Sequence, residues 1–94
     1  MNTYETLVIM NPELTEEQVA ELTTKLSSVI EQAGEVKEVD QWGKKRLAYE
    51  IDKVRDGYYT LITFSSEPSV LDELNHVYRI TEKVLRGIIV KLDK

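Results

Sequence analysis

The residues best suited to chemistry in this sequence are positively charged and lie close together. The stretch QWGKKRLAYEI begins at Gln41, holds three consecutive cations, and is followed shortly by two more. Clustered lysines and arginines bind phosphate oxygens, and such contacts position a protein on a nucleic acid without reading its bases. The cluster, Lys44, Lys45, Arg46, Lys53 and Arg55, therefore predicts a phosphate-binding patch.

The rest of the chain is acidic, which makes this cluster stand out. The 94 residues hold 17 acids and 12 bases, a net charge of -5. Residues 1–40 hold nine acids and two bases, whereas residues 41–94 hold eight acids and ten bases. Net acidity disfavours non-specific binding to nucleic acid, so any such contact must be local. A second explanation stays open, because lysines on an edge strand also prevent pairing with other chains.

Other chemistries find little support in the residue types. His76 is the only histidine and there is no cysteine, so no nucleophile–base–orienter set and no soft metal site can be assembled. The longest aliphatic run, Leu7 to Met10, is far shorter than the ~20 residues of a membrane span. We therefore predict no enzymatic activity, metal, cofactor, small-molecule substrate or membrane partner.

Hydrophobic periodicity and breaker residues predict the elements that must position the basic cluster. Thr15 and Gln18 form a capping-box pattern, and Gly34 stands where a helix C-cap glycine belongs. Gly43 predicts a bulge in a long strand, and Asp56–Gly57 predicts a hairpin turn. Residues 65–68 predict a break that caps the next helix. The expected elements are strands over 4–10, 36–52, 58–64 and 85–92, and helices over 15–33 and 70–80.

This β-α-β-β-α-β order is typical of the ferredoxin-like, split β-α-β fold of the α+β class. We expect one domain over residues 1–94, in which a four-stranded antiparallel sheet carries both helices on one face. Right-handed crossovers place the first and third strands at the centre and the second and fourth at the edges. The basic cluster would then lie on an edge strand and its hairpin.

The sheet face away from the helices is predicted to carry Leu7, Ile9, Tyr59 and Leu61. A half-solvated antiparallel sheet alternates cleanly between apolar and polar residues, and these strands are more apolar than that. Scattered surface apolar residues are one explanation. Covering of this face by a partner or by a second copy is the other. The last strand is apolar on both parities, so the sequence leaves its buried side open.

RNA recognition motifs share this element order and stack bases on aromatic residues of the third strand. The third strand here reads DGYYTLITF, with Thr60 and Thr63 where those aromatics belong. The sequence therefore excludes that mode of RNA binding.

The string WGKKRLAYEI, with Tyr4–Glu5, Asn11–Pro12, DGYY and VLRGIIVK around it, resembles the bacterial small-subunit ribosomal protein six family along essentially the whole chain. The resemblance implies a ferredoxin-like structural protein of the cytoplasmic ribosome. It further implies pairing with small-subunit ribosomal protein eighteen and joint binding to the central domain of the small-subunit rRNA.

Two aromatic residues of this string, Trp42 and Tyr49, are predicted to support the cations at the RNA, since an indole can stack on an arginine or a base. The alternative for Trp42 is packing at the end of the sheet. A different function also stays open: a ferredoxin-like regulatory module that binds a small molecule and dimerises through its open face.

Overall fold

The structure is a computed structural model that describes residues 2–51 and 54–92, with side chains described for all of these except 44–51 and 54–56. The observed element order confirms the predicted β-α-β-β-α-β sequence. The elements are β1 (Asn2–Met10), α1 (Glu16–Glu31), β2 (Gly34–Ile51), β3 (Val54–Ser66), α2 (Ser69–Ile80) and β4 (Val84–Lys91).

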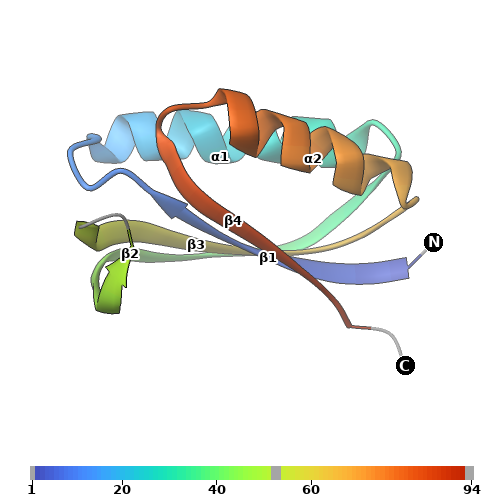
Figure 1. Ribbon diagram of the computed structural model, residues 1–94. Coiled ribbons are helices and arrows are strands. Elements are labelled where there is room, and N and C mark those ends of the chain that lie inside the picture. The colour runs from blue at the N-terminus through green and yellow to red at the C-terminus, as the bar shows by residue number, and fades with distance from the viewer. Residues whose placement is uncertain (1, 52–53, 93–94) are drawn as a thin grey trace.

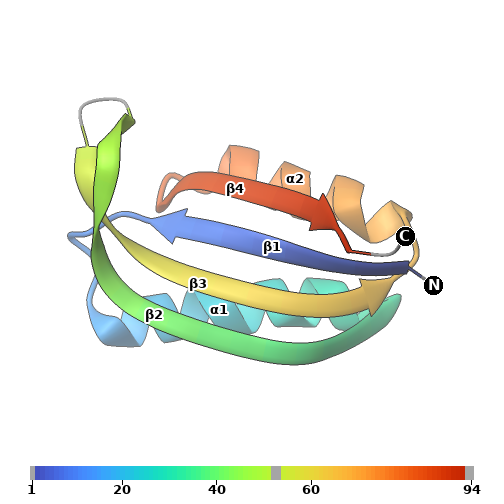
Figure 2. The ribbon, with the colours of Figure 1, turned by 90° about the horizontal axis from the view of Figure 1, so that it is seen from below.

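The four strands form one antiparallel sheet in the order β2-β3-β1-β4. Both helices cover the same face of this sheet (Figure 1). The opposite face, which we call the open face, carries no helix and is turned toward the viewer in Figure 2. The predicted ferredoxin-like fold, with β1 and β3 central, is therefore confirmed.

The start of α1 follows the sequence prediction, and its end does not. The Thr15 hydroxyl accepts from the Gln18 amide at 3.1 Å and the Gln18 side chain accepts from the Thr15 amide at 2.9 Å, so the capping box is present. The C-cap is Gln32 in ordinary right-handed conformation, and Gly34 is already in β2. Gly34 is needed for another reason, because a Cβ there would overlap the backbone of β3 at Ser65.

The prediction of a bulge at Gly43 is confirmed, and the prediction of a turn at Asp56–Gly57 is wrong. Gly43 has a φ of 80° and lies at a register shift in β2. Asp56 and Gly57 lie within β3, where Gly57 pairs with Lys45. The connection falls on residues 52–53, outside the described residues. Gly57 permits close approach instead, since a Cβ there would come within 2.8 Å of Ile9 Cγ2.

The break predicted at residues 65–68 is confirmed at residues 67–68, and the N-cap of the second helix is Pro68 rather than a residue with a capping hydroxyl. Ser65 and Ser66 belong to β3, and α2 begins after Pro68, which makes no side-chain capping bond. Pro68 has a φ of -56° and a ψ of -25°. Its ring holds φ near this helical value, so the chain enters the helix without a capping hydroxyl.

The core fills the space between the sheet and both helices. Tyr4 and Phe64 make a tilted ring contact at 5.6 Å across the two central strands. The Thr6 and Tyr78 hydroxyls hydrogen-bond at 2.8 Å within the core, and burial raises the pKa of Tyr78 to about 12 while the bond to Thr6 opposes that rise. The fully buried apolar side chains are Val8, Met10, Leu26, Ile30, Ile62, Phe64 and Leu74.

The register of β4 decides which of its sides is buried. Gly87 lies opposite Val8 and Ile89 opposite Thr6, so both face the helices. A Cβ on Gly87 would overlap the Tyr78 ring, which packs directly on the strand at this point. Ile88 and Val90 consequently lie on the open face, where they are 37% and 47% exposed.

Candidate functional site

The centre of the open face is a row of apolar side chains that crosses three strands. Leu7 on β1 lies opposite Leu61 on β3 and Ile88 on β4. Directly opposed residues of antiparallel strands point to the same side of a sheet, so the three side chains are neighbours. Leu7 and Leu61 are half-buried and Ile88 is exposed. We call this set the leucine row.

A stacked aromatic pair extends the leucine row toward β2. The rings of Trp42 and Tyr59 lie 6.1 Å apart and within 13° of parallel. Trp42 also donates from Nε1 to Asp40 Oδ2 at 2.9 Å, which fixes the indole, and the side chain is still 42% exposed. The bulge next to Gly43 shifts the strand register at this position. Trp42, predicted beside the cations, therefore lies with Tyr59, predicted at the partner surface.

Ile9 differs from the other three residues predicted for this face. It lies opposite Tyr59 on β3 and Arg86 on β4, as its parity requires. However, it is only 4% exposed, because the start of β3 packs closely on it at Gly57. Ile9 is therefore covered by the start of β3 and contributes almost nothing to the accessible surface of the open face.

Acidic residues flank the apolar residues of the open face. Glu5 lies opposite Thr63, Glu38 lies opposite Thr63 from the other side, and Asp40 lies opposite Leu61. Glu38 and Asp40 are exposed and Glu5 is half-buried. An apolar centre with an acidic border complements a partner that carries apolar and basic side chains.

The basic cluster lies on the arm that β2 and β3 form beyond the end of β1. Pairing of β1 with β3 stops at Met10 and Tyr58, so the arm extends past the rest of the sheet (Figure 2). Within the arm, Lys44 pairs with Tyr58 and Arg46 with Asp56.

The predicted RNA-binding residues are not all described to the same extent. The backbones of Lys44, Lys45, Arg46, Tyr49 and Arg55 lie on this arm, and their side chains are outside the described part of the structure. Lys53 lies outside the described residues altogether. The RNA-binding role of all these residues stays a prediction.

Sequence reasoning left the side of Ile88 and Val90 open, and it missed the part of the acidic border that lies on β2, Glu38 and Asp40. The alternation of β4 is ambiguous because Ile89 is apolar too, and only pairing with β1 separates the two sides. Glu38 and Asp40 are both recognisable as acids in the sequence, but their place on the open face depends on the register of β2, which shifts between Val36 and Glu38.

Two other kinds of site are not found in the described part of the chain. No group of three or more His, Asp or Glu side chains there could hold a metal ion. No helix there is long and apolar enough to cross a membrane.

Comparison with known proteins decides the family. Residues 3–91 match the family model of ribosomal protein S6. The chain belongs to the ribosomal protein S6 family. Small ribosomal subunit protein bS6 of Clostridium kluyveri is 53% identical over the full length of both chains, and that of Caldanaerobacter subterraneus is 44% identical over 99% of each. A crystal structure of 30S ribosomal protein S6 from Thermotoga maritima has a TM-score of 0.90 and 31% identity, covering 97% of this chain and 87% of that one.

Membership of the S6 family confirms three expectations from the sequence. The family consists of structural proteins rather than enzymes, its place is the ribosome in the cytoplasm, and its fold is the ferredoxin-like one described above. The alternative of a regulatory small-molecule module is therefore replaced by a ribosomal role.

Proposed function

We propose that this S6-family chain pairs with small-subunit ribosomal protein eighteen through its open face. We further propose that the pair binds the central domain of the small-subunit rRNA, where the β2–β3 arm contacts phosphates. The observation that carries the proposal is the division between a basic arm and an apolar open face with an acidic border. Each surface suits a different kind of partner.

The leucine row and the aromatic pair support the protein contact. Fully burying one large apolar side chain contributes about 1.5–3 kcal/mol. Leu7, Leu61 and Ile88 lie side by side with Trp42 and Tyr59 beyond them, so one partner surface can cover all five. Tryptophan and tyrosine near the centre of an interface are the usual hot spots. We expect Tyr59 and Trp42 to contribute most to the affinity.

The acidic border supports a division of labour with the partner. Glu5, Glu38 and Asp40 would repel RNA phosphates, so the open face does not suit direct RNA binding. A basic partner seated there would neutralise these carboxylates and add positive charge to the complex. RNA affinity should consequently rise when the partner binds.

The arm's role is tested by the salt dependence of RNA binding. Each phosphate contact contributes about 0.7–0.9 to the slope of log affinity against log salt concentration. Replacing Lys44, Lys45 and Arg46 with alanine should flatten that slope by about 2–3 in partner-assisted binding to a central-domain rRNA fragment.

A charge-matched variant provides the control for this experiment. Lys25, Lys37 and Lys91 are exposed and belong to α1, the start of β2 and the end of β4 rather than to the arm, so their triple alanine variant removes the same charge elsewhere. It should keep nearly the wild-type slope. If both triple variants had the same slope of log affinity against log salt concentration, the cations of the arm would not contact phosphates. Their remaining role would be to prevent pairing of the edge strand with other chains.

A further inference from the structure

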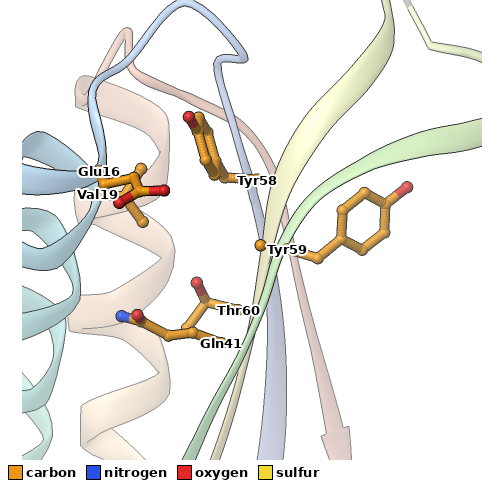
Figure 3. Close-up of a pocket in the computed structure, with 7 residues that line it drawn as sticks. Glu16, Val19, Gln41, Tyr58, Tyr59 and Thr60 are labelled. Atoms are coloured by element: carbon orange, nitrogen blue, oxygen red, sulfur yellow. The ribbon is translucent and has the colours of Figure 1, made fainter.

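A cavity of about 260 Å³ with both polar and apolar lining lies between α1 and the β2–β3 pair, on the helix side of the sheet. It is separate from the open face: Figure 3 shows Tyr59 projecting from the sheet on the side opposite Thr60. The volume lies slightly below the ~300–1,000 Å³ of pockets that hold drug-sized ligands. The cavity therefore suits a small group rather than a nucleotide. Its lining residues are Glu16, Val19, Gln41, Gly43, Tyr58, Tyr59 and Thr60.

Thr60 is the residue that marks this cavity as a binding site. Its side chain is 0% exposed, and its hydroxyl has no hydrogen-bond partner within the described residues. A buried hydroxyl without a partner destabilises a fold, which is why nearly all such groups are paired. In Figure 3 the Thr60 hydroxyl points into the cavity, toward the space that the Glu16 carboxylate also faces. The Thr60 hydroxyl is therefore placed to form a hydrogen bond with a polar group that occupies the cavity.

The side-chain amide of Gln41, next to Thr60 in the cavity wall, is oriented so that its oxygen stays available as a hydrogen-bond acceptor. Gln41 donates from Nε2 to Thr23 Oγ1 at 3.3 Å, and Thr23 in turn donates to the Val19 carbonyl at 2.9 Å. Since the amide nitrogen is engaged by α1, Gln41 Oε1 remains as an acceptor. The chain of two bonds ties β2 to the helix beside the cavity.

The side chains that line the cavity favour a cation that carries several hydrogen-bond donors. Glu16 supplies a carboxylate, Gln41 an amide oxygen and Thr60 a hydroxyl oxygen, three acceptor groups for the three donors of an ammonium group. The Tyr58 ring adds a face that attracts cations, and Val19 offers an apolar wall. The positive end of the α1 dipole opposes a cation, but it is equivalent to about half a charge and is outweighed by the full charge of the Glu16 carboxylate in the first turn.

We propose that the cavity formed by Glu16, Gln41, Tyr58 and Thr60 binds a primary alkylammonium group. Its methylene chain lies along Val19, and its charge is held by Glu16 and the buried Thr60 hydroxyl. Two sources carry this group, a free aliphatic amine and the side chain of a lysine. The inference stands apart from the partner and RNA contacts proposed above.

Nuclear magnetic resonance titration with 1,5-diaminopentane tests the proposal, at a fixed ionic strength that suppresses general attraction to an acidic protein. The amine should shift the backbone amides of Glu16, Gln41, Tyr58 and Thr60 along one saturating curve, whereas 1-pentanol should not. A second titration with Nα-acetyl-lysine methylamide separates the sources. Binding of both compounds assigns a lysine side chain, and binding of the diamine alone assigns a free amine.

Variants make this test specific to the cavity. Glu16→Gln should weaken diamine binding about tenfold or more, because it removes a charge-assisted hydrogen bond. Thr60→Val, which keeps the shape of the side chain, should weaken it several-fold. Glu17→Gln removes the same charge one residue away, from a side chain that does not line the cavity, and should bind as the wild type does.

Two results would overturn the proposal. One is the absence of a saturating shift at the four amides with either compound. The other is equal weakening by Glu16→Gln and Glu17→Gln, which would mean general attraction to the acidic end of α1. Glu16 is an exposed residue, so its variant remains informative even if Thr60→Val alters the fold.

Discussion

The helix-covered face and the open face are made by alternate residues of the same central strands, yet they differ in what covers them. On the helix side of β3, Ile62 and Phe64 are 0% exposed. On the other side of the same strand, Leu61 and Thr63 keep part of their surface in contact with solvent. Neighbouring residues of one strand therefore differ in their surroundings: one set is buried in the core, and the other remains partly exposed on the open face.

The helix-covered face itself has two unequal halves. Beneath α2, Thr6 pairs with Tyr78 and the Tyr78 ring packs directly on Gly87. Beneath α1, Thr60 has no partner in the described structure and a cavity remains beside it. A buried threonine can therefore either complete a core or border a cavity within it, depending on whether the covering helix offers its hydroxyl a partner.

The largest effect is expected from shortening the core side chain at the centre of β3. Phe64→Ala should lower the free energy of unfolding by about 3–5 kcal/mol, because it removes a buried ring and leaves a cavity. Thr63→Ala, one residue away on the open face, should change it by less than about 0.5 kcal/mol. Urea denaturation measures both. Similar losses at the two positions would break the distinction between the faces.

Alkaline pH should reveal the buried phenol of the α2 half. The pKa of Tyr78 is raised from 10.0 to about 12 in the folded protein. The unfolded chain ionises this phenol from about pH 10, while the folded protein keeps it neutral up to about pH 12. The contribution of Tyr78 to the free energy of unfolding is therefore complete below about pH 10 and falls by about 2–3 kcal/mol between about pH 10 and 12. Tyr78→Phe should remove this part of the pH dependence. Denaturation curves of both proteins at several pH values measure it, and parallel pH profiles would contradict the assignment.

The two fully buried threonines of the sheet, Thr6 and Thr60, should respond oppositely to the same substitution. Thr6→Val leaves the Tyr78 hydroxyl buried without its partner and should cost about 1–3 kcal/mol. Thr60→Val removes an unpaired hydroxyl and should be neutral or stabilising by up to about 1 kcal/mol. Thermal or urea unfolding of the two variants side by side checks this. A comparable loss in both would show that the Thr60 hydroxyl contributes to stability after all.

The smallest effect on stability is expected at the aromatic pair. Trp42→Ala removes an exposed stacking contact with Tyr59 and should cost about 0.5–1.5 kcal/mol. Circular dichroism should show an intact fold, while affinity for the partner protein falls. An unfolded Trp42→Ala variant would instead mean that Trp42 packs the end of the sheet, the alternative that the sequence left open.

The fold was largely predictable because its signals are local. Thr15 and Gln18 specify the start of α1, and Gly43 marks the bulge that shifts β2. Gly34 and Gly57 were misinterpreted for a common reason: each is a glycine because another strand passes close to it, and such an approach is set by tertiary packing. A sequence pattern cannot distinguish that need from a turn or a cap.

The candidate site was predictable only in part. Leu7, Leu61 and Tyr59 follow from strand alternation, which fixes their side of the sheet. The stacking of Trp42 on Tyr59 depends on the bulge register, and the burial of Ile9 depends on how the arm leaves the sheet. The unpaired hydroxyl of Thr60 has no sequence signal, because its partner would have to come from α1, which is distant in sequence.

The central claim, that the open face docks the partner protein, is tested most directly by calorimetric titration of small-subunit ribosomal protein eighteen into Leu61→Glu and Tyr59→Asp variants. Ile80→Glu is the control, since Ile80 is an equally apolar, 60% exposed residue at the end of α2. Each open-face variant should keep a normal circular dichroism spectrum and bind at least about tenfold more weakly, because a charge would be buried against an apolar partner surface. Ile80→Glu should bind normally. Wild-type affinity in both open-face variants would contradict the account and move the docking surface to the β2–β3 arm or an edge strand.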